Sequence, residues 1–228
     1  MPKGVLSFAL KACTNGLNTP DNLKRWGKRK MDKCDLCGNY ANLEHILNWC
    51  SVSLHQGRTK WRHDSVLDHM FRELVKGKKN EVTMYAHIPG HQVNGGTIPA
   101  DILTTAQRPD IVLVNRSEKK IALLELTISF EKNIDSANQK KTLRYLNLAA
   151  DLTNAGWEMD RRPFEVGSRG QITKRNKTTI CDITRKYGLN VKKSKLLKDL
   201  SKIALLCSFI VFQAHCQPDW QASPFLHP

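Results

Sequence analysis

The sequence predicts an α/β (α+β) fold in which a small mixed β-sheet is flanked by helices. Two apolar runs rich in β-branched and aliphatic residues, 111–114 and 121–130, surround the polar turn Asn-Arg-Ser-Glu-Lys-Lys, a pattern that is typical of a β-hairpin. A further strand is predicted at 163–168. Segments with helical periodicity precede and follow these runs, so strands and helices alternate loosely along the chain.

The helices are predicted from the spacing of apolar residues and from residues that begin or end a helix. Between residues 60 and 76, five apolar side chains recur at helical spacing: Val66, Leu67, Met70, Phe71 and Leu74. A second helix is predicted to begin near Asp135 or Ser136 and to end at Gly156. Its expected apolar face contains Leu143, Leu146 and Ala150.

The last helix is predicted at 195–214 and contains the most hydrophobic run of the chain, 203–212. That run is far shorter than the ~20 residues that a helix needs to cross a bilayer. We therefore interpret it as a buried helix and expect no membrane association.

Two domains are expected. Residues 1–56 are predicted to hold a short N-terminal helix, a turn, a basic stretch at 24–33 and a Cys/His cluster, and residues 57–228 to form the larger domain. The segment 88–102 is rich in Gly and Pro, which predicts a loop in front of the hairpin.

The composition favours a polyanionic partner. The chain has 36 Lys and Arg against 21 Asp and Glu, a formal net charge of +15. Such a surplus most often indicates nucleic-acid binding, although a basic protein without such a partner is the alternative. Seven unevenly spaced cysteines without a preceding secretory signal argue against a disulfide scaffold. Metal ligation or burial in a reducing compartment explains them better.

Four of the metal-ligating residues have the spacing of a zinc site. Cys34, Cys37, His45 and Cys50 follow the pattern C-x2-C-x7-H-x4-C, in which the C-x2-C turn presents two thiolates and Gly38 relaxes that turn. With all four positions filled by protein, the Zn²⁺ is expected to be structural. The alternative interpretation is a free cysteine pair beside a surface histidine.

The predicted hairpin brings two acidic residues together. If Val114 pairs with Ile121, Asp110 lies directly across from Glu125. Two like charges on one face repel each other, so a cation is needed to justify the pair. Mg²⁺, or Mn²⁺ in its place, takes oxygen ligands of this kind and commonly binds substrate phosphate as well.

A lysine on the following predicted helix adds to this acidic pair. Lys141 and Tyr145 are four residues apart and share one helical face. A lysine near a metal site is able to orient water and to stabilise the charge on a scissile phosphate, which together predict phosphodiester hydrolysis. An ordinary solvated helix face is the alternative. Glu73, on the helix at 60–76, is either a third acid or an exposed helix charge.

These motifs resemble the C-terminal region of proteins encoded by site-specific non-LTR retrotransposons, in which a C-C-H-C zinc finger precedes a restriction-like endonuclease of the PD-(D/E)XK superfamily. The resemblance spans nearly the whole chain. It rests on NLKRWGK at 22–28, the zinc pattern, GRTKWRHDSVL at 57–67, RPDIVL, ALLELTI, KKTLRYLNLAADLTNAGW, PFEVGSRG and LSKIALLCSFIVFQAH.

The resemblance implies a role for each motif residue. Asp110 and Glu125 would bind the catalytic metal, Lys141 would be the catalytic lysine, and Tyr145 would complete a K-x3-Y motif. The superfamily usually has its lysine two residues after the second acid, where this chain has Thr127. The retrotransposon branch moves that lysine to the next helix, which leaves Lys140 or Lys141 as the candidate. Contacts with DNA are expected from Arg58, Arg62, His63, Arg108, Lys174 and Arg175.

The resemblance also implies a function. Proteins of this family nick the target DNA and use the freed 3′-hydroxyl to prime copying of the element RNA. The chain has no Tyr/Phe-x-Asp-Asp polymerase motif, so we expect the reverse transcriptase domain of the same polyprotein, the target DNA and the element RNA as partners, in the nucleus or otherwise the cytoplasm. The alternatives are a catalytically silent DNA/RNA-binding module left by a decayed element, and a repair or junction-resolving nuclease of the same fold.

Overall fold

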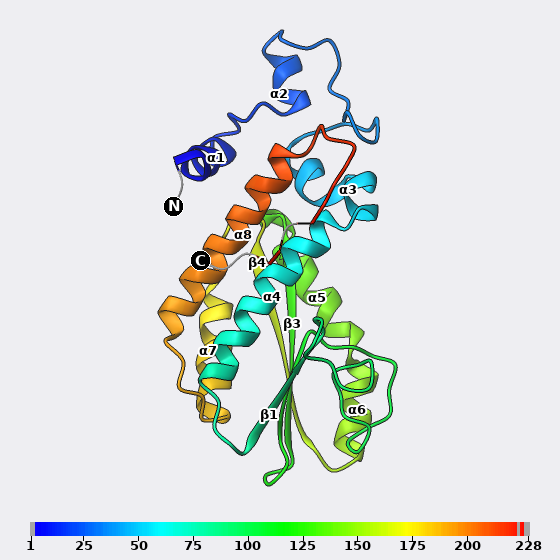
Figure 1. Ribbon diagram of the computed structural model, residues 1–228, viewed down its shortest axis with the longest axis vertical. Helices are drawn as coiled ribbons and strands as arrows, with labels where there is room; N and C mark the ends of the chain where they lie inside the picture. The colour runs from blue at the N-terminus through cyan, green and yellow to red at the C-terminus, as the bar shows by residue number, and fades with distance from the viewer. Residues whose placement is uncertain (1–2, 223, 226–228) are drawn as a thin grey trace.

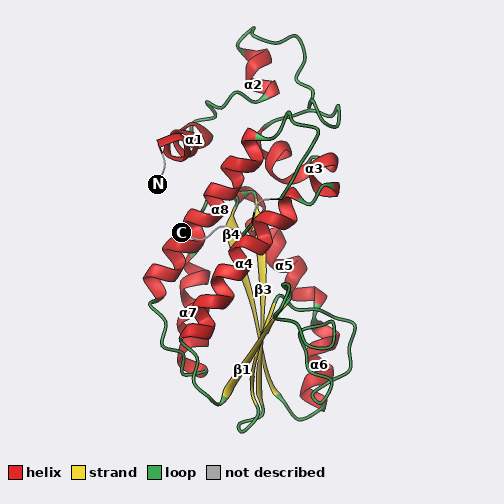
Figure 2. Cartoon of the chain, in the orientation of Figure 1, coloured by secondary structure: helices red, strands yellow, loops and turns green. Residues whose placement is uncertain are grey.

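The computed structural model describes residues 3–222 and 224–225, and its centre is a four-stranded sheet with the order β1-β2-β3-β4. β2 is antiparallel to both β1 and β3, whereas β3 and β4 are parallel. The strands are β1 (Val82–Ala86), β2 (Ile111–Asn115), β3 (Lys120–Ser129) and β4 (Glu158–Gly167). Helices flank this mixed sheet (Figures 1 and 2), which confirms the predicted fold class.

The hairpin has the predicted register. Val114 pairs with Ile121 and Ile111 with Leu124. The turn is closed by Asn115, whose Oδ1 accepts hydrogen bonds from the Ser117 hydroxyl at 2.8 Å and the Glu118 amide at 3.1 Å. An asparagine side chain often closes a turn in this way.

Alternate residues of each strand point to opposite faces of the sheet. Both faces are buried, because other elements of the chain cover each of them. The first face meets α4 (Arg58–Lys76), α7 (Lys174–Lys186) and α8 (Lys193–Gln213), and the second meets α6 (Leu146–Asn154) and the loop before β2. From the central strands, the first core takes Ile111, Leu113, Ala122, Leu124, Leu126 and Ile128, and the second takes Val112, Val114, Ile121 and Leu123.

The two long helices were predicted well. All five apolar residues expected on the first, Val66, Leu67, Met70, Phe71 and Leu74, are buried on α4. The predicted last helix corresponds to α8 and is largely buried, as its hydrophobic run indicated. Among the described residues, no helix combines the length and the apolar character needed to cross a membrane.

The helix predicted to run to Gly156 is two helices. α5 (Ile134–Arg144) ends at Tyr145, whose backbone angles (φ −109°, ψ 22°) are not helical, and α6 begins with the next residue. The break changes which side chains face the sheet. Tyr145, Leu148 and Leu152 are buried, whereas three residues assigned to the apolar face are exposed: Leu143, Leu146 and Ala150.

Two strand segments were not predicted. β1 is a short strand that follows a polar turn, and β4 begins at Glu158, ahead of the predicted 163. The added part of β4 is charged, but it lies at the edge of the sheet, where its side chains pair with each other and with α7. Arg162 contacts Asp160 at 2.7 Å and Asp182 at 3.2 Å. An edge position also tolerates Pro163 within the strand.

The N-terminal region packs on the same core as the sheet. It contains α1 (Lys3–Cys13), α2 (Pro20–Arg25), η1 (His45–Trp49) and α3 (Ser51–His55), and α1 lies beside α8 in Figure 1. The Phe8 ring lies 5.6 Å from that of Phe209 and 5.4 Å from that of Phe212. Residues 1–56 therefore share a core with the larger part, and their separate folding stays a prediction.

The docking of α1 on α8 is testable with a core truncation. Phe8→Ala should lower the free energy of unfolding by about 3 kcal/mol, because it removes a buried ring and leaves a cavity. Thermal or urea unfolding measures the loss. Leu6→Ala, at an exposed position of the same helix, is the matched control. Equal stability of the two variants would contradict the docked position of α1.

Candidate active site and metal centre

The four predicted zinc ligands converge. The ligand atoms of Cys34, Cys37, His45 and Cys50 all lie within 4.8 Å of one another. The sulfurs of Cys34 and Cys50 are 3.8 Å apart, and Cys37 Sγ lies 3.3 Å from His45 Nε2. Zn–S bonds of ~2.3 Å in a tetrahedron require sulfur atoms about 3.8 Å apart, so the cluster is compatible with structural zinc.

Local backbone geometry produces this convergence. Gly38 has a positive φ of 73°, and its amide donates to the Cys34 carbonyl at 2.9 Å, which closes the C-x2-C turn as expected. On the other side, the Cys50 amide donates to the His45 carbonyl at 2.8 Å across a wide helical turn. Burial lowers the pKa of His45, which favours the neutral imidazole that a metal requires.

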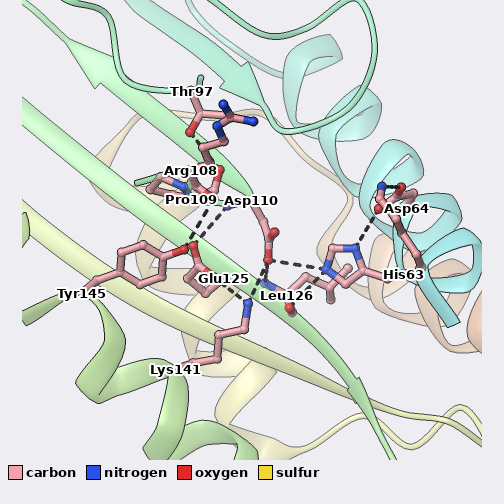
Figure 3. Close-up of polar contacts among 11 residues, drawn as sticks. His63, Asp64, Thr97, Arg108, Pro109, Asp110, Glu125, Leu126, Lys141 and Tyr145 are labelled. Atoms are coloured by element: carbon pink, nitrogen blue, oxygen red, sulfur yellow. Dashed lines mark hydrogen bonds and ion pairs between the residues drawn. The ribbon is translucent and has the colours of Figure 1, made fainter. Parts of the chain in front are cut away.

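The two predicted acids lie side by side in the interior (Figure 3). The Asp110 amide donates to Glu125 Oε1 at 3.1 Å, and Asp110 Oδ2 accepts from the Leu126 amide at 2.8 Å. Glu125 is 1% exposed and Asp110 is 8% exposed. The segment before β2 is held by Thr97, whose hydroxyl donates to the Pro109 carbonyl at 2.9 Å.

Two cationic side chains reach the acids from different helices. Lys141 Nζ, on α5, lies 2.8 Å from Glu125 Oε2 and 3.5 Å from Asp110 Oδ2. His63 Nε2, on α4, lies 3.5 Å from Asp110 Oδ2, while its Nδ1 lies 2.9 Å from Asp64 Oδ1. Protein side chains thus supply the positive charge that the pair of carboxylates requires.

This arrangement sets the ionisation of the site. Burial and the charge of Asp110 raise the pKa of Glu125. Burial also opposes the ionisation of Asp110, but the hydrogen bond and charge of His63, together with Lys141, hold its pKa below the usual value. Burial disfavours the His63 cation, yet hydrogen bonds to Asp110 and Asp64 outweigh it and raise the His63 pKa to about 9.

The remaining motif residues divide into neighbours of the acids and residues elsewhere. The buried Tyr145 hydroxyl donates to the Arg108 carbonyl at 3.4 Å, so it supports the segment that leads to Asp110, and the Arg108 side chain is exposed. Lys141 contacts the carboxylates, whereas Lys140 is exposed and lines a separate pocket.

Glu73 does not join this site. It pairs with Lys76 at 2.6 Å and follows His63 by ten residues on α4, about 15 Å along a helix that rises ~1.5 Å per residue. The structure therefore favours the interpretation of Glu73 as a helix-surface charge.

Two of the arginines expected to contact DNA are internal. Arg58 is fully buried, and its guanidinium donates to the carbonyls of Ala214 at 2.5 Å and Gln217 at 2.6 Å. Arg62 donates to Ser208 Oγ at 3.0 Å, and burial lowers its pKa to about 10. Because both groups are used within the protein, we assign them a structural role in joining α4 to the C-terminal part.

The other expected DNA contacts differ in their surroundings. Lys174 and Arg175 are exposed at the start of α7, and Arg175 pairs with Asp135 at 2.7 Å. His63 contacts Asp110, which sequence reasoning did not predict. Its only signal was its place in a helix with charged neighbours, and nothing in that spacing relates the helix to the hairpin.

A comparison of the chain with protein-family models finds no match, and neither does a comparison with curated proteins. The site is thus defined by its own geometry. Within the described part of the chain, the Cys/His cluster is the one group of three or more metal-ligating side chains that converge.

Removal of one cysteine ligand should show whether the cluster binds structural zinc or whether its four side chains are close together without a metal. Cys37→Ser should lose bound zinc and destabilise the N-terminal region, because the remaining buried thiols lose the ion that holds them together. Metal analysis of purified protein and thermal unfolding measure both effects. Cys13→Ser, at an exposed cysteine outside the cluster, is the control. Unchanged zinc content in Cys37→Ser would refute the assignment.

The ionic contact between His63 and Asp110 predicts a pH dependence. A raised His63 pKa means that the contact stabilises the fold fully below about pH 6.5, the ordinary histidine value, and that this stabilisation is lost as the pH rises through about 9. NMR titration without added divalent metal should give a His63 pKa near 9. In Asp110→Asn that pKa should fall, whereas an unchanged value would exclude the contact.

Proposed function

We propose that this chain is a metal-dependent DNA endonuclease with a PD-(D/E)XK-type catalytic core, from the C-terminal part of a site-specific non-LTR retrotransposon protein. The observation that carries the proposal is the contact of Lys141 with both Glu125 and Asp110. These three residues come from the segment before β2, from β3 and from α5, and two carboxylates with a lysine are suited to metal-assisted phosphodiester cleavage. The net charge of +15 supports a polyanionic substrate.

The donor chemistry of the site fits Mg²⁺ or Mn²⁺. Mg²⁺ is commonly held by one or two carboxylates, with water and substrate phosphate as its other ligands, and Asp110 with Glu125 supplies two adjacent carboxylates. When bound, such a metal neutralises phosphate oxygens and lowers the pKa of water. A metal there would take over part of the charge compensation that Lys141 and His63 provide.

The proposed roles of the side chains follow from their contacts. With a metal compensating the carboxylates, Lys141 would turn from Glu125 towards the scissile phosphate, where its charge stabilises the negative charge that develops during cleavage. Tyr145 supports the backbone at Arg108, and the exposed Arg108 side chain lies two residues from Asp110, where it is suited to bind the DNA backbone. Lys174 and Arg175 are proposed as more distant phosphate contacts.

In the proposed biological setting, the nick in the target DNA primes reverse transcription by a polymerase domain of the same polyprotein. The zinc-compatible module, residues 1–56 with the Cys/His cluster, assists nucleic-acid binding. Its basic stretch includes Arg25 and Lys28, whose cationic groups lie 5.9 Å and 5.8 Å from the centroid of the Trp26 ring. Exposed aromatic and basic groups of this kind suit nucleic-acid strands.

Plasmid nicking tests the proposal. The wild type should nick supercoiled plasmid with Mg²⁺, and Asp110→Asn should reduce the rate by about 100-fold or more while DNA affinity stays nearly unchanged. Lys141→Ala should lose activity, whereas Lys198→Ala, at an exposed lysine on α8, should retain it. Gel electrophoresis measures nicking, and fluorescence anisotropy measures affinity.

Three outcomes would redirect the assignment. Loss of both cleavage and DNA affinity in Asp110→Asn would indicate a structural role for that residue. Salt-sensitive DNA binding without nicking by the wild type would favour the silent nucleic-acid-binding module. Preferential cleavage of four-way junctions over plasmid would favour a junction-resolving nuclease.

A further inference from the structure

A pocket of about 390 Å³ lies between the zinc-compatible module and the sheet. Its walls come from η1, from the end of β3 and from α5. Its lining includes Asn48, Trp49, Thr127, Ser129, Ala137 and Lys140. The volume falls within the range of small-ligand sites in proteins, about 300–1,000 Å³.

The pocket lies next to the acidic residues, further along the strand β3 that carries Glu125. Thr127 and Ser129 follow Glu125 by two and four residues, so all three side chains lie on one face of β3. At ~3.3 Å per residue they lie about 7 and 13 Å further along the strand. On α5, Lys141 contacts the carboxylates and the adjacent Lys140 lines the pocket.

The walls contain polar atoms that have no hydrogen-bond partner in the protein. These buried atoms are Asn48 Oδ1, Thr127 Oγ1 and Ser129 Oγ, and the Ser129 residue is only 8% exposed. A buried polar atom left unpaired costs about 1–3 kcal/mol. Three residues that line one pocket thus each keep an unused hydrogen-bonding atom in its wall, and a ligand that offers both donors and acceptors would pair with these atoms after a side-chain rotation.

An aromatic side chain stands at the same pocket. Trp49 is 58% exposed, and its Nε1 donates to Glu44 Oε1 at 3.3 Å, which holds the ring in place. Glu44 is itself tied to the sheet side, since Oε1 accepts from Asn133 Nδ2 at 2.7 Å and Oε2 pairs with Lys132 at 2.5 Å. The ring thus presents an apolar surface beside polar groups.

We infer that this pocket binds an unpaired nucleobase next to the cleaved phosphate, an inference that rests on the proposed nuclease function. The base stacks on Trp49, its polar edge pairs with Asn48, Thr127 and Ser129 once their side chains turn towards the pocket, and Lys140 contacts the neighbouring phosphate. The substrate is therefore DNA with a locally unpaired strand rather than an intact duplex.

Binding of a fluorescent base analogue tests this inference without cleavage. The probe is a duplex with one unpaired 2-aminopurine, compared with the same duplex fully paired, in Mg²⁺-free buffer. The wild type should bind the unpaired probe about tenfold more tightly and quench its emission, because base–aromatic stacking contributes about 1–3 kcal/mol per base. Equal affinity for both duplexes would overturn the inference.

Variants test whether the preference for the unpaired probe comes from the pocket. Trp49→Ala should lose both the preference and the quenching, Trp49→Phe should keep most of the preference, and Leu54→Ala, at another exposed apolar residue, should leave both unchanged. Because Trp49 adjoins Cys50, zinc content is measured for each variant. Ala137→Leu, which fills the pocket from α5, should also lose the preference, whereas the exposed Ala150→Leu should not. A preference that survives both Trp49→Ala and Ala137→Leu would overturn the inference.

The two proposals fail in different ways. Nicking of plasmid without any preference for the unpaired probe would leave the nuclease standing and exclude the base pocket. A Trp49-dependent preference without nicking would leave the base pocket standing and exclude the nuclease.

Discussion

The burial of two carboxylates side by side is the constraint on which this structure depends. Asp110 and Glu125 repel each other, and removal from water increases that repulsion unless cations and hydrogen bonds compensate. The compensation comes from three directions: backbone amides of the hairpin, Lys141 on α5 and His63 on α4. Helices on opposite faces of the sheet therefore contact the same pair of carboxylates. The strand register, the start of α5 and the position of α4 must all be compatible with these contacts.

The zinc-compatible module is integrated with the catalytic candidate rather than appended to it. Asn48 donates to the Ile128 carbonyl at 3.2 Å, and Glu44 joins Asn133 and Lys132 just after β3. Asn48 and Glu44 both lie between the first and the last ligand of the cluster, Cys34 and Cys50. Hydrogen bonds and an ion pair therefore join that segment to the end of the strand that carries Glu125.

Local patterns allowed some features to be predicted, and long-range packing decided the others. The hairpin register, α4, α8 and the convergence of the four zinc ligands follow from short spacings. The break at Tyr145 was not predictable, because the residues on both sides favour a helix and burial of the tyrosine ring decides the phase. The burial of Arg58 and the contact of His63 with Asp110 each join segments far apart in sequence, and an isolated charged residue usually indicates a surface.

The unequal length of the central strands has a further consequence. β3 continues past the last residue that β2 pairs with, so one edge of its final residues has no neighbouring strand. Side chains occupy that edge: Asp110 accepts from the Leu126 amide, His63 contacts the Leu126 carbonyl at 3.3 Å, and Asn48 donates to the Ile128 carbonyl. The candidate active site thus fills the place of an absent strand segment. A strand segment that continued β2 along these residues would take the backbone hydrogen-bonding groups that the three side chains now use.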